Sequence, residues 1–474
     1  MTAGVAAHIA PARAALCRAE LTEQLDDALT KAPLDRAYVG MVVQTQATES
    51  TRQTLYGHNV DRFFTPASGA KLLTTAAALH QLGADYQIRT SVYGSPGPGA
   101  STNLRVVGRG DPTITDADLA DLALQLAQSG VTRVNQLVLE DAYFPQFATN
   151  PTWEWGDAQW YYAPPVNSLI LNGNGVTVQI APTQIGRPVA IFWPEAPSGH
   201  ILPLDNDATT VAPQAEALPL KLWRTGGDEQ VRLTGHLAQT ARSISYTLAV
   251  LDPAQRFADA LVGSLQTQGI SVARTAISDR ALAPEGAALA TLTSPSLGEL
   301  LISTNQNSNN LYAEVLLKTL GVTQGAPPIS DASAAGGTVV AEVLAELGVN
   351  PAHLRLADGS GLSRHNLVTP EALVTTLQAM AVHPEADVFL ESLAVAGVSG
   401  TLRNRLAGTV LEKRVQGKSG ALTGNVSLSG YLQPPDYEPL VFSLLMNHSD
   451  QHASVLRDRI DEILLLMAQL SDDC

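Results

Sequence analysis

The N-terminal part of the chain carries a helical and then a strand-like pattern of apolar positions. Leu21, Leu25 and Leu29 recur at every fourth position, which predicts a helix over residues 16–31. The apolar run over residues 37–44 is short and contains several valines, which predicts a strand. A helix that leads into a strand is therefore expected here.

The C-terminal part predicts two strands followed by a helix. Residues 426–432 and 440–446 are apolar runs separated by a Pro-rich turn, a pattern typical of an antiparallel pair. Residues 453–470 place Leu456 and Ile460 on the apolar face of a helix. We expect this helix and the N-terminal one to cover one shared sheet.

The middle of the chain, residues 91–279, has a different composition, which is rich in Pro, Gly and Thr. Its short apolar runs are residues 102–107, 134–139, 176–180 and 245–251. A helical pattern stands out over residues 116–129. The pattern predicts β-rich inserted material with a few helices, and we find no internal repeat or low-complexity tract.

Composition predicts a large, acidic, globular protein. The 474 residues exceed the size at which one hydrophobic core stops growing, so two or three domains are expected. The hydrophobic content of 45% against 16% charged residues fits a packed enzyme. A net charge of −16 without a basic run argues against nucleic acid as a partner. No apolar stretch reaches the roughly 18 residues of a membrane span, so no integral membrane segment is expected.

Residues 1–15 and the two cysteines support weaker expectations. Residues 1–15 lack a positive segment followed by a continuous apolar one, so no export signal is evident. Either the protein is cytoplasmic or the sequence omits part of a leader. Cys17 and Cys474 are too few for a disulfide framework and fit no metal site. We expect two unpaired thiols, with a disulfide between them as the alternative.

A first candidate for chemistry is the string Ser-Gly-Ala-Lys at positions 68–71. It leads into a strong helix-forming run that ends at Gly83, which places Ser68 at a helix N-terminus. Lys71 lies one turn further, so its amine can reach the Ser68 hydroxyl. To act as a base this amine must be neutral, and burial beside other cations lowers the pKa of a lysine. The alternative, which the string alone favours, is that Ser68 caps the helix and Lys71 is solvated.

Two Ser-x-Asn strings lie in an Asn-rich segment: Ser303 with Asn305, and Ser308 with Asn310. The second is preferred because a helix-forming run begins at Leu311 and would hold its polar groups on a rigid element. Without such a helix, an Asn-rich segment is commonly turn and capping chemistry.

The third string, Gly-Lys-Ser-Gly at positions 417–420, resembles the end of a phosphate-binding loop. That loop needs a glycine at the position of Glu412, so the phosphate interpretation fails. An extended segment remains possible, on which Lys418 holds a substrate carboxylate and backbone N–H groups receive an oxyanion. A solvated lysine at a strand end is the simpler interpretation of this string alone.

Together the three strings point to one chemistry. A serine with a nearby lysine, a Ser/Asn pair and a second lysine, in this order, form the constellation of penicillin-interacting serine acyltransferases. The nucleophile elbow of other serine hydrolases fails at Thr401, where a glycine is required. The ten histidines form no His-Glu-x-x-His motif. We therefore expect a serine acyltransferase without a metal or other cofactor.

Further strings accompany them: Gly-Arg-Gly-Asp-Pro at 108–112, the stretch 153–165, the run that continues from 308 to 314, and Asp-Gly-Ser-Gly-Leu-Ser-Arg at 358–364. Over roughly residues 21–470 the chain resembles the low-molecular-mass class C penicillin-binding proteins, the D-alanyl-D-alanine carboxypeptidase and endopeptidase family. Positions 68 and 308 are 240 residues apart. The related β-lactamases place these motifs much closer, so the spacing favours the peptidase.

The resemblance implies an α/β (α+β) fold. It comprises a transpeptidase- and β-lactamase-like domain, whose antiparallel sheet is flanked by helices, and two smaller β-rich inserted domains. The expected boundaries are 1–90 with 280–474 for the catalytic domain, 91–167 with 248–279 for inserted domain II, and 168–247 for inserted domain III. All three motifs would then belong to the catalytic domain.

The resemblance also assigns roles to the motif residues. Ser68 would be the acylated nucleophile and Lys71 the base that activates it. Ser308 would relay a proton to the leaving amine, and Asn310 would hold the substrate's peptide. The reaction would be a two-step acyl transfer with release of D-Ala.

Lys418 and Ser419 would bind the terminal carboxylate of the substrate. The N–H groups of Ser68 and Ala421 would form the oxyanion hole. Two residues depart from the family pattern: Ser419 stands where Thr is usual, which keeps the hydroxyl, and Ala421 stands where Thr or Ser is frequent. The second change removes a hydroxyl near the carboxylate site.

Three more residues match positions that in relatives approach the free end of the peptidoglycan side chain: Asp157, Tyr162 and Arg364. Asp157 would suit an amine at that end. The implied substrates are peptidoglycan stem peptides, and β-lactam antibiotics would acylate Ser68 as mimics of the D-Ala-D-Ala end and be released slowly. Because peptidoglycan lies outside the cytoplasmic membrane, the resemblance implies an exported protein, periplasmic or associated with the cell wall.

Two other functions stay open. A β-lactamase or esterase with the same strings would turn penicillin over rapidly, whereas a non-catalytic peptidoglycan-binding scaffold would be unaffected by Ser68→Ala. The sequence does not separate carboxypeptidase from endopeptidase action, and it leaves the side-chain preference and the oligomeric state open.

Overall fold

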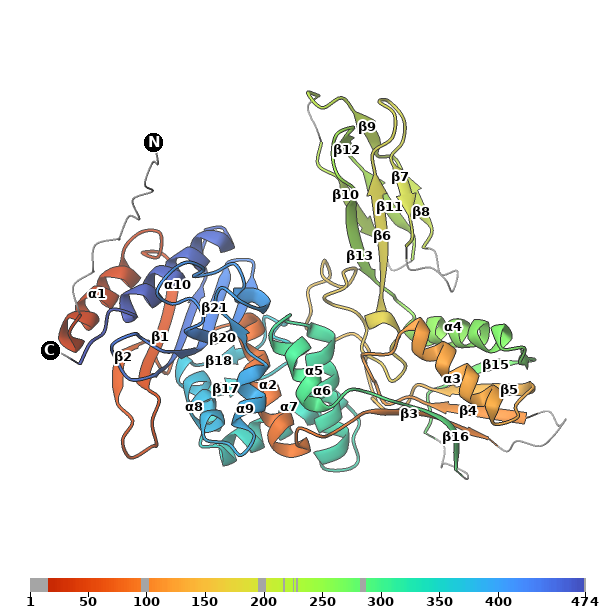
Figure 1. Cartoon of the computed structure of the whole chain (residues 1–474), viewed down its shortest axis with the longest axis horizontal. Helices are drawn as coiled ribbons and strands as arrows, with labels where there is room; N and C mark the ends of the chain where they lie inside the picture. The colour runs from red at the N-terminus through yellow and green to blue at the C-terminus, as the bar shows by residue number, and fades with distance from the viewer. Residues whose placement is uncertain are drawn as a thin grey trace, which may run out of the picture.

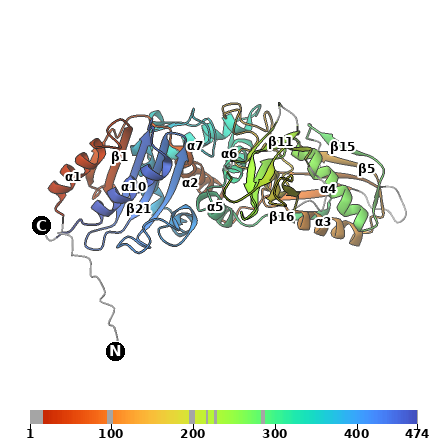
Figure 2. The same cartoon turned by 90° about the horizontal axis from the view of Figure 1, so that it is seen from above.

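The computed structural model describes residues 16–94, 102–194, 202–215, 218–224, 226, 229–281 and 287–472. The molecule is elongated, with the red and blue segments of the sequence together at one end and the yellow and green segments at the other (Figures 1 and 2). The expected mixed helix-and-sheet fold is confirmed. The predictions made for residues 1–15 and for Cys474 lie outside the described residues.

The end built from both parts of the sequence contains a six-stranded sheet of order β19-β20-β21-β22-β1-β2, with antiparallel neighbours. Its strands are β1 (Tyr38–Thr45), β2 (Thr54–His58), β19 (Ala394–Val395), β20 (Val415–Leu422), β21 (Asn425–Leu432) and β22 (Leu440–Asn447). Leu432 pairs with Leu440 across the turn between β21 and β22, and Tyr38 of β1 pairs with Asn447. The predicted antiparallel pair is confirmed, and the predicted N-terminal strand pairs with it.

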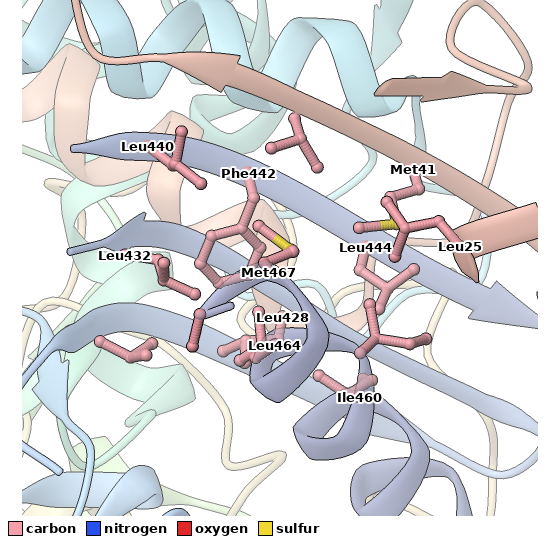
Figure 3. Close-up of a cluster of buried hydrophobic side chains, with 14 of the residues drawn as sticks. Leu25, Met41, Leu428, Leu432, Leu440, Phe442, Leu444, Ile460, Leu464 and Met467 are labelled. Carbon is pink, nitrogen blue, oxygen red and sulfur yellow. The ribbon is translucent and has the colours of Figure 1, made fainter. Parts of the chain in front are cut away.

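Helices cover both faces of this sheet, which explains why β21 and β22 are buried along their whole lengths. On one face, α1 (Arg18–Thr30) and α10 (Ala453–Met467) pack in a cluster that contains Leu25, Phe442 and Ile460 (Figure 3). The helices of the other cluster are α2 (Lys71–Leu82), α5 (Leu297–Asn305), α6 (Asn310–Gln324), α7 (Ala332–Glu346), α8 (Pro370–Ala381) and α9 (Ala386–Glu391). The two terminal helices therefore share one sheet, as predicted.

The first and last described segments of the chain are joined. The Leu16 N–H donates to the Gln469 carbonyl at 2.8 Å, and Leu16 forms a parallel bridge with Leu470. Cys17 is disulfide-bonded, and the described residues contain no free cysteine. The expectation of two unpaired thiols is therefore wrong, because pairing between distant cysteines depends on the tertiary fold and cannot be deduced from their positions in the sequence.

The chain beyond α2 forms a second, mixed sheet of order β14-β5-β4-β3-β16, with β15 beside β5. Its strands are β3 (Arg89–Gly94), β4 (Thr102–Val107), β5 (Arg133–Glu140), β14 (Ser271–Val272), β15 (Thr275–Ser278) and β16 (Ala288–Thr293). Helices α3 (Asp116–Gln128) and α4 (Pro253–Thr267) share its apolar cluster. The helix predicted over 116–129 is confirmed. Helix α4 was not predicted, although Asp252 caps it and a proline follows at its first position.

Strand β16 marks a difference from the expected domain boundary at residue 280. It pairs with β3, so residues 288–293 belong to the second sheet and not to the catalytic one. The strand by which the chain leaves the insertion thus lies beside the strand by which it enters. Composition does not reveal such a long-range pairing, because the pairing depends on a partner about 200 residues away.

The third group of strands forms small sheets around a separate apolar cluster that includes Val178, Val231 and Leu248. These strands are β6 (Gly175–Ala181), β7 (Ala190–Phe192), β8 (Leu204–Asn206), β9 (Thr209–Val211), β10 (Lys221–Arg224), β11 (Val231–Thr234), β12 (His236–Ala238) and β13 (Ile244–Ala249). Short elements complete the structure: β17 (Leu354–Arg355), β18 (Leu367–Val368) and the 3-10 turns η1 (Ala67–Ala70), η2 (Asn172–Asn174), η3 (Pro351–His353) and η4 (Gly400–Leu402). No helix within the described ranges has the length and hydropathy needed to cross a membrane.

Candidate active site

Ser68 lies in the short turn η1, which leads directly into α2. The preceding residue, Ala67, has a φ of +49°, a left-handed conformation that a non-glycine residue rarely adopts. Gly361 packs against this turn so closely that a Cβ there would lie 1.8 Å from the Ala67 carbonyl oxygen. The contact with Gly361 therefore supports the turn that presents Ser68, at the helix N-terminus where the sequence places it.

Lys71 is the first residue of α2, and its side chain is fully buried (0% exposed). Its Nζ lies 3.0 Å from the Ser68 Oγ, 2.6 Å from the Asn310 Oδ1 and 2.6 Å from the Ser360 carbonyl oxygen. Burial lowers the pKa of Lys71 to about 7, although nearby carboxyl groups favour the charged form. The alternative of a solvated lysine is therefore wrong.

A neutral Lys71 amine can satisfy all three of its polar neighbours. Such an amine has two N–H donors and one lone pair. Asn310 Oδ1 and the Ser360 carbonyl oxygen can only accept, so they take both donors. The lone pair is then left for the Ser68 hydroxyl proton at an N···O distance of 3.0 Å. Geometry and pKa together allow Lys71 to act as the base for Ser68.

The Ser360 carbonyl is held in place by a buried loop, residues 358–363. On α6, Glu314 Oε1 accepts from the N–H groups of residues 359 and 360 at 2.9 and 2.8 Å. Asp358 accepts from two further backbone N–H groups of the loop at 2.7 and 2.6 Å, and from the Trp153 indole at 2.9 Å. Two buried carboxyl groups therefore position the acceptor that orients Lys71.

The protonation of Glu314 should be measurable as a pH dependence of stability. Burial raises the pKa of Glu314 to about 8. An acid with a raised folded-state pKa stabilises the fold fully below its unfolded pKa and loses this contribution as pH rises through the folded pKa. We expect the Glu314 contribution to the free energy of unfolding to fall by about 3 kcal/mol between about pH 5.5 and 7.5, and Glu314→Gln to remove this part of the slope.

Urea unfolding across this pH range measures the effect. Glu342→Gln, which changes an exposed carboxylate on α7, is the matched control and should keep the wild-type slope. A Glu314→Gln variant with an unchanged slope would show that Glu314 titrates alike in the folded and unfolded chains.

Ser308 and Lys418 form a second bonded pair of motif residues. Ser308 lies just before α6 with a φ of +57°, and the buried Lys418 Nζ donates to its Oγ at 2.9 Å and to the Ser419 carbonyl at 2.7 Å. Burial and the charge of Lys71 lower the pKa of Lys418 well below its usual value. The competing Asn305 donates to two buried hydroxyls of the scaffold, away from this pair.

A cavity of about 450 Å³ opens beside Ser68. It is lined by Ser68, Ser308, Thr401, Asn404, Arg405, Ser419, Gly420, Ala421 and Arg457. Strand β20 forms one wall, and a Cβ at Gly420 would lie 2.8 Å from the Ser68 backbone nitrogen, so this strand approaches the serine through a glycine. The Ser419 hydroxyl donates to Thr401 Oγ1 at 2.7 Å. Among the described residues, no group of three or more His, Cys, Asp or Glu is placed to hold a metal ion.

The residues expected near the end of the substrate side chain are only partly brought together. The Tyr162 carbonyl accepts from the Asn310 amide at 2.7 Å, and the Tyr162 hydroxyl donates to Asp157 Oδ1 at 2.9 Å. Tyr162 and Asn310 also line a second cavity of about 360 Å³. Arg364 instead donates to Glu154 at 2.5 Å and to a backbone carbonyl at 3.2 Å.

Four residues that support or line the site were not predicted from the sequence: Glu314, Asp358, Thr401 and Arg457. The two carboxyl groups fall inside strings that were recognised, and an acidic residue within the apolar run 311–317 is the signal that could have marked Glu314. Thr401 was considered only as the residue that breaks a nucleophile elbow. No local pattern marks Arg457.

Comparison with known proteins identifies the family. Residues 21–469 match the model of the D-Ala-D-Ala carboxypeptidase 3 (S13) family. The D-alanyl-D-alanine carboxypeptidase of Actinomadura sp. (strain R39) is 35% identical over 459 residues, which cover 93% of this chain and 84% of that protein. The crystal structure of penicillin-binding protein 4 (dacB) from Haemophilus influenzae superposes with a TM-score of 0.82 at 24% identity, covering 93% of this chain and 97% of that one.

A peptidoglycan endopeptidase of Bdellovibrio bacteriovorus, Bd3459, shares the fold more distantly, with a TM-score of 0.53 at 16% identity over 90% of this chain and 91% of that one. The family match extends over nearly all of the chain and includes the three motifs that meet around Ser68. The chain therefore belongs to the D-Ala-D-Ala carboxypeptidase 3 (S13) family of low-molecular-mass class C penicillin-binding proteins and is a serine-type carboxypeptidase.

Proposed function

We propose that the enzyme removes the terminal D-Ala from peptidoglycan stem peptides through an acyl-enzyme on Ser68. One observation carries the assignment of the nucleophile. The buried Lys71 Nζ lies 3.0 Å from Ser68 Oγ and donates to two groups that can only accept, so the lone pair of a neutral Lys71 would face the Ser68 hydroxyl. A serine in such a contact is activated for attack on a carbonyl carbon.

In the first step, Ser68 Oγ attacks the carbonyl of the penultimate D-Ala and its proton passes to Lys71. The N–H groups of Ser68 and Ala421 stabilise the oxyanion, and the approach of β20 to the Ser68 nitrogen supports this role. The C–N bond then breaks. The leaving amine needs one proton, the one that Lys71 accepted, and Ser308 relays it. Water hydrolyses the acyl-enzyme in the second step.

The remaining motif and rim residues bind the substrate. Asn310 holds the peptide of the substrate, and Lys418 and Ser419 form the site of its terminal carboxylate. Asp157 and Tyr162 face the free end of the stem-peptide side chain, for which the Asp157 carboxylate offers a partner to an amine. We assign Arg364 to the same region, where release of Glu154 would free its guanidinium.

The proposed location follows from the location of the substrate. Because peptidoglycan lies outside the cytoplasmic membrane, we propose an exported protein, periplasmic or associated with the cell wall. Recovery of the native protein only from the cytosolic fraction would contradict this.

We keep the domain division proposed from the sequence, with the second boundary of the catalytic domain moved past β16 to about residue 294, because β16 pairs with β3 in the second sheet.

The proposed function is tested by incubating the protein with benzylpenicillin and locating the adduct by mass spectrometry. We expect one penicilloyl group on the peptide that contains Ser68, persisting for far longer than the acylation takes, together with release of D-Ala from a D-Ala-D-Ala peptide. An adduct on another residue would contradict the mechanism. Rapid turnover of the penicillin would instead favour the β-lactamase alternative.

Endopeptidase action is a second candidate with the same chemistry. The second cavity adjoins Ser308 and Asn310, so space for a larger leaving group exists next to the motif residues. Parallel assays with a cross-linked peptide dimer and a monomeric pentapeptide separate the two activities. Cleavage of the monomer alone would restrict the enzyme to carboxypeptidase action.

A further inference from the structure

Two arginines from outside the recognised motifs line the cavity beside Ser68. Arg405 lies after η4, and Arg457 lies in the first part of α10, which packs on the opposite face of the sheet from α2. Both arginines line this cavity together with Ser68, Ser308 and strand β20, although neither belongs to a sequence motif. Their positive charges bear on the binding of an anionic substrate.

The first of these arginines is already neutralised. Arg405 donates to Asp461 from Nη2 at 2.7 Å and from Nε at 3.2 Å, and both side chains are largely buried. Asp461 lies four residues after Arg457 on α10, which is the spacing at which the two could pair along the helix. Because Arg405 occupies this carboxylate, Asp461 does not neutralise Arg457.

The second arginine keeps its charge available. Arg457 is exposed, and within the described part of the chain it is placed in no ion pair. An arginine stays protonated at every physiological pH and offers planar donors that suit a carboxylate. Arg457, which is among the residues that line the cavity, therefore carries a permanent positive charge.

The motif lysines supply only part of that charge. Lys71 directs its Nζ to Ser68, Asn310 and a backbone carbonyl, and Lys418 directs its Nζ to Ser308 and a backbone carbonyl. Both side chains are 0% exposed. In addition, residue 421 is an alanine and offers no hydroxyl to an anion. A substrate carboxylate in this cavity thus lacks a full countercharge from the motifs.

We propose that Arg457 supplies the countercharge for the terminal carboxylate of the substrate and so determines the preference for a free C-terminal acid. The inference rests on the proposed function and deepens it by adding a specificity residue that no motif contains. Arg405 contributes indirectly, because its ion pair with Asp461 leaves Arg457 free to bind substrate. Arg405 is thus a positioning residue.

The test compares a peptide that ends in D-Ala-D-Ala carboxylate with the same peptide as its C-terminal amide. We expect Arg457→Ala to lower kcat/KM for the acid about 10-fold, mainly through KM, and to change the amide little, so that the acid-to-amide ratio falls by the same factor. Arg457→Lys should restore part of the ratio, because it restores the charge without the planar fork. Raising the salt concentration should reduce the ratio in the wild type and leave it almost unchanged in Arg457→Ala.

Arg459→Ala is the matched control, since Arg459 lies on the same helix but pairs with Glu462 outside this cavity. It should leave the ratio unchanged. A wild-type ratio in Arg457→Ala would overturn the inference while the Ser68 chemistry stands. A wild-type enzyme that neither releases D-Ala nor reacts with penicillin would contradict the proposed function, and this inference with it.

Discussion

Ser68→Ala is expected to abolish both the penicillin adduct and the release of D-Ala. The hydroxyl is the only atom through which Ser68 can form an acyl-enzyme, and alanine keeps the backbone N–H that lies next to β20. Loss of a nucleophile typically lowers kcat/KM by about 10⁴-fold or more. Mass spectrometry after exposure to benzylpenicillin and a D-Ala release assay measure the two effects.

The loss must be separated from damage to the fold. Ser303→Ala is the matched control, because Ser303 belongs to the Ser-x-Asn string whose asparagine faces the scaffold. This control should form the adduct at the wild-type rate. If Ser68→Ala kept the wild-type adduct and D-Ala release, the nucleophile would be a different residue or the protein would be a scaffold.

Lys71→Met is expected to lower the acylation rate by about 10³-fold and to remove its pH dependence near neutrality. In the proposed mechanism the base is the neutral amine of Lys71, whose pKa is lowered to about 7 by burial. In the wild type the neutral fraction rises as pH increases through 7, so acylation should rise and then level off above about pH 8. Methionine fills similar space without an amine and cannot accept the proton.

Stopped-flow or quenched acylation by benzylpenicillin from about pH 5.5 to 8.5 gives the profile. Lys318→Met is the matched control, because Lys318 is another buried lysine whose pKa is lowered, to about 8. Its Nζ donates to two backbone carbonyls away from Ser68. We expect the Lys318→Met variant to be less stable than the wild type and to show a pH profile of acylation with the same shape. A wild-type profile in Lys71→Met would assign the proton transfer to another group.

Much of the site could be predicted because its first motif is local. Ser68 and Lys71 are three residues apart at the start of a helix, so the helical repeat alone brings amine and hydroxyl within reach. The terminal helices and strands were also predicted, since their apolar periodicity is regular over several turns. The order of the three strings indicated one function although each string alone favoured a structural role.

The inserted region was harder to predict for a different reason. Pairing between β3 and β16 joins positions that lie far apart in the sequence, and the disulfide of Cys17 depends on the folded chain. Helix α4 begins with a capping residue, Asp252, and a proline at its first position, but the Pro- and Gly-rich composition around it favoured the prediction of strands. Local patterns identify such elements without specifying their partners.

By itself, the sequence determined the family, the candidate nucleophile with its neighbouring lysine, and the sheet built from both parts of the chain. Only the tertiary structure decided the protonation of the site, because the pKa of Lys71 depends on complete burial and on the loop that Glu314 and Asp358 hold over it. The same is true of Arg457. Its place in the cavity, and its lack of a carboxylate partner within the described ranges, result from the packing of α10 beside Arg405. Desolvation and charge pairing of this kind arise only when the chain has folded.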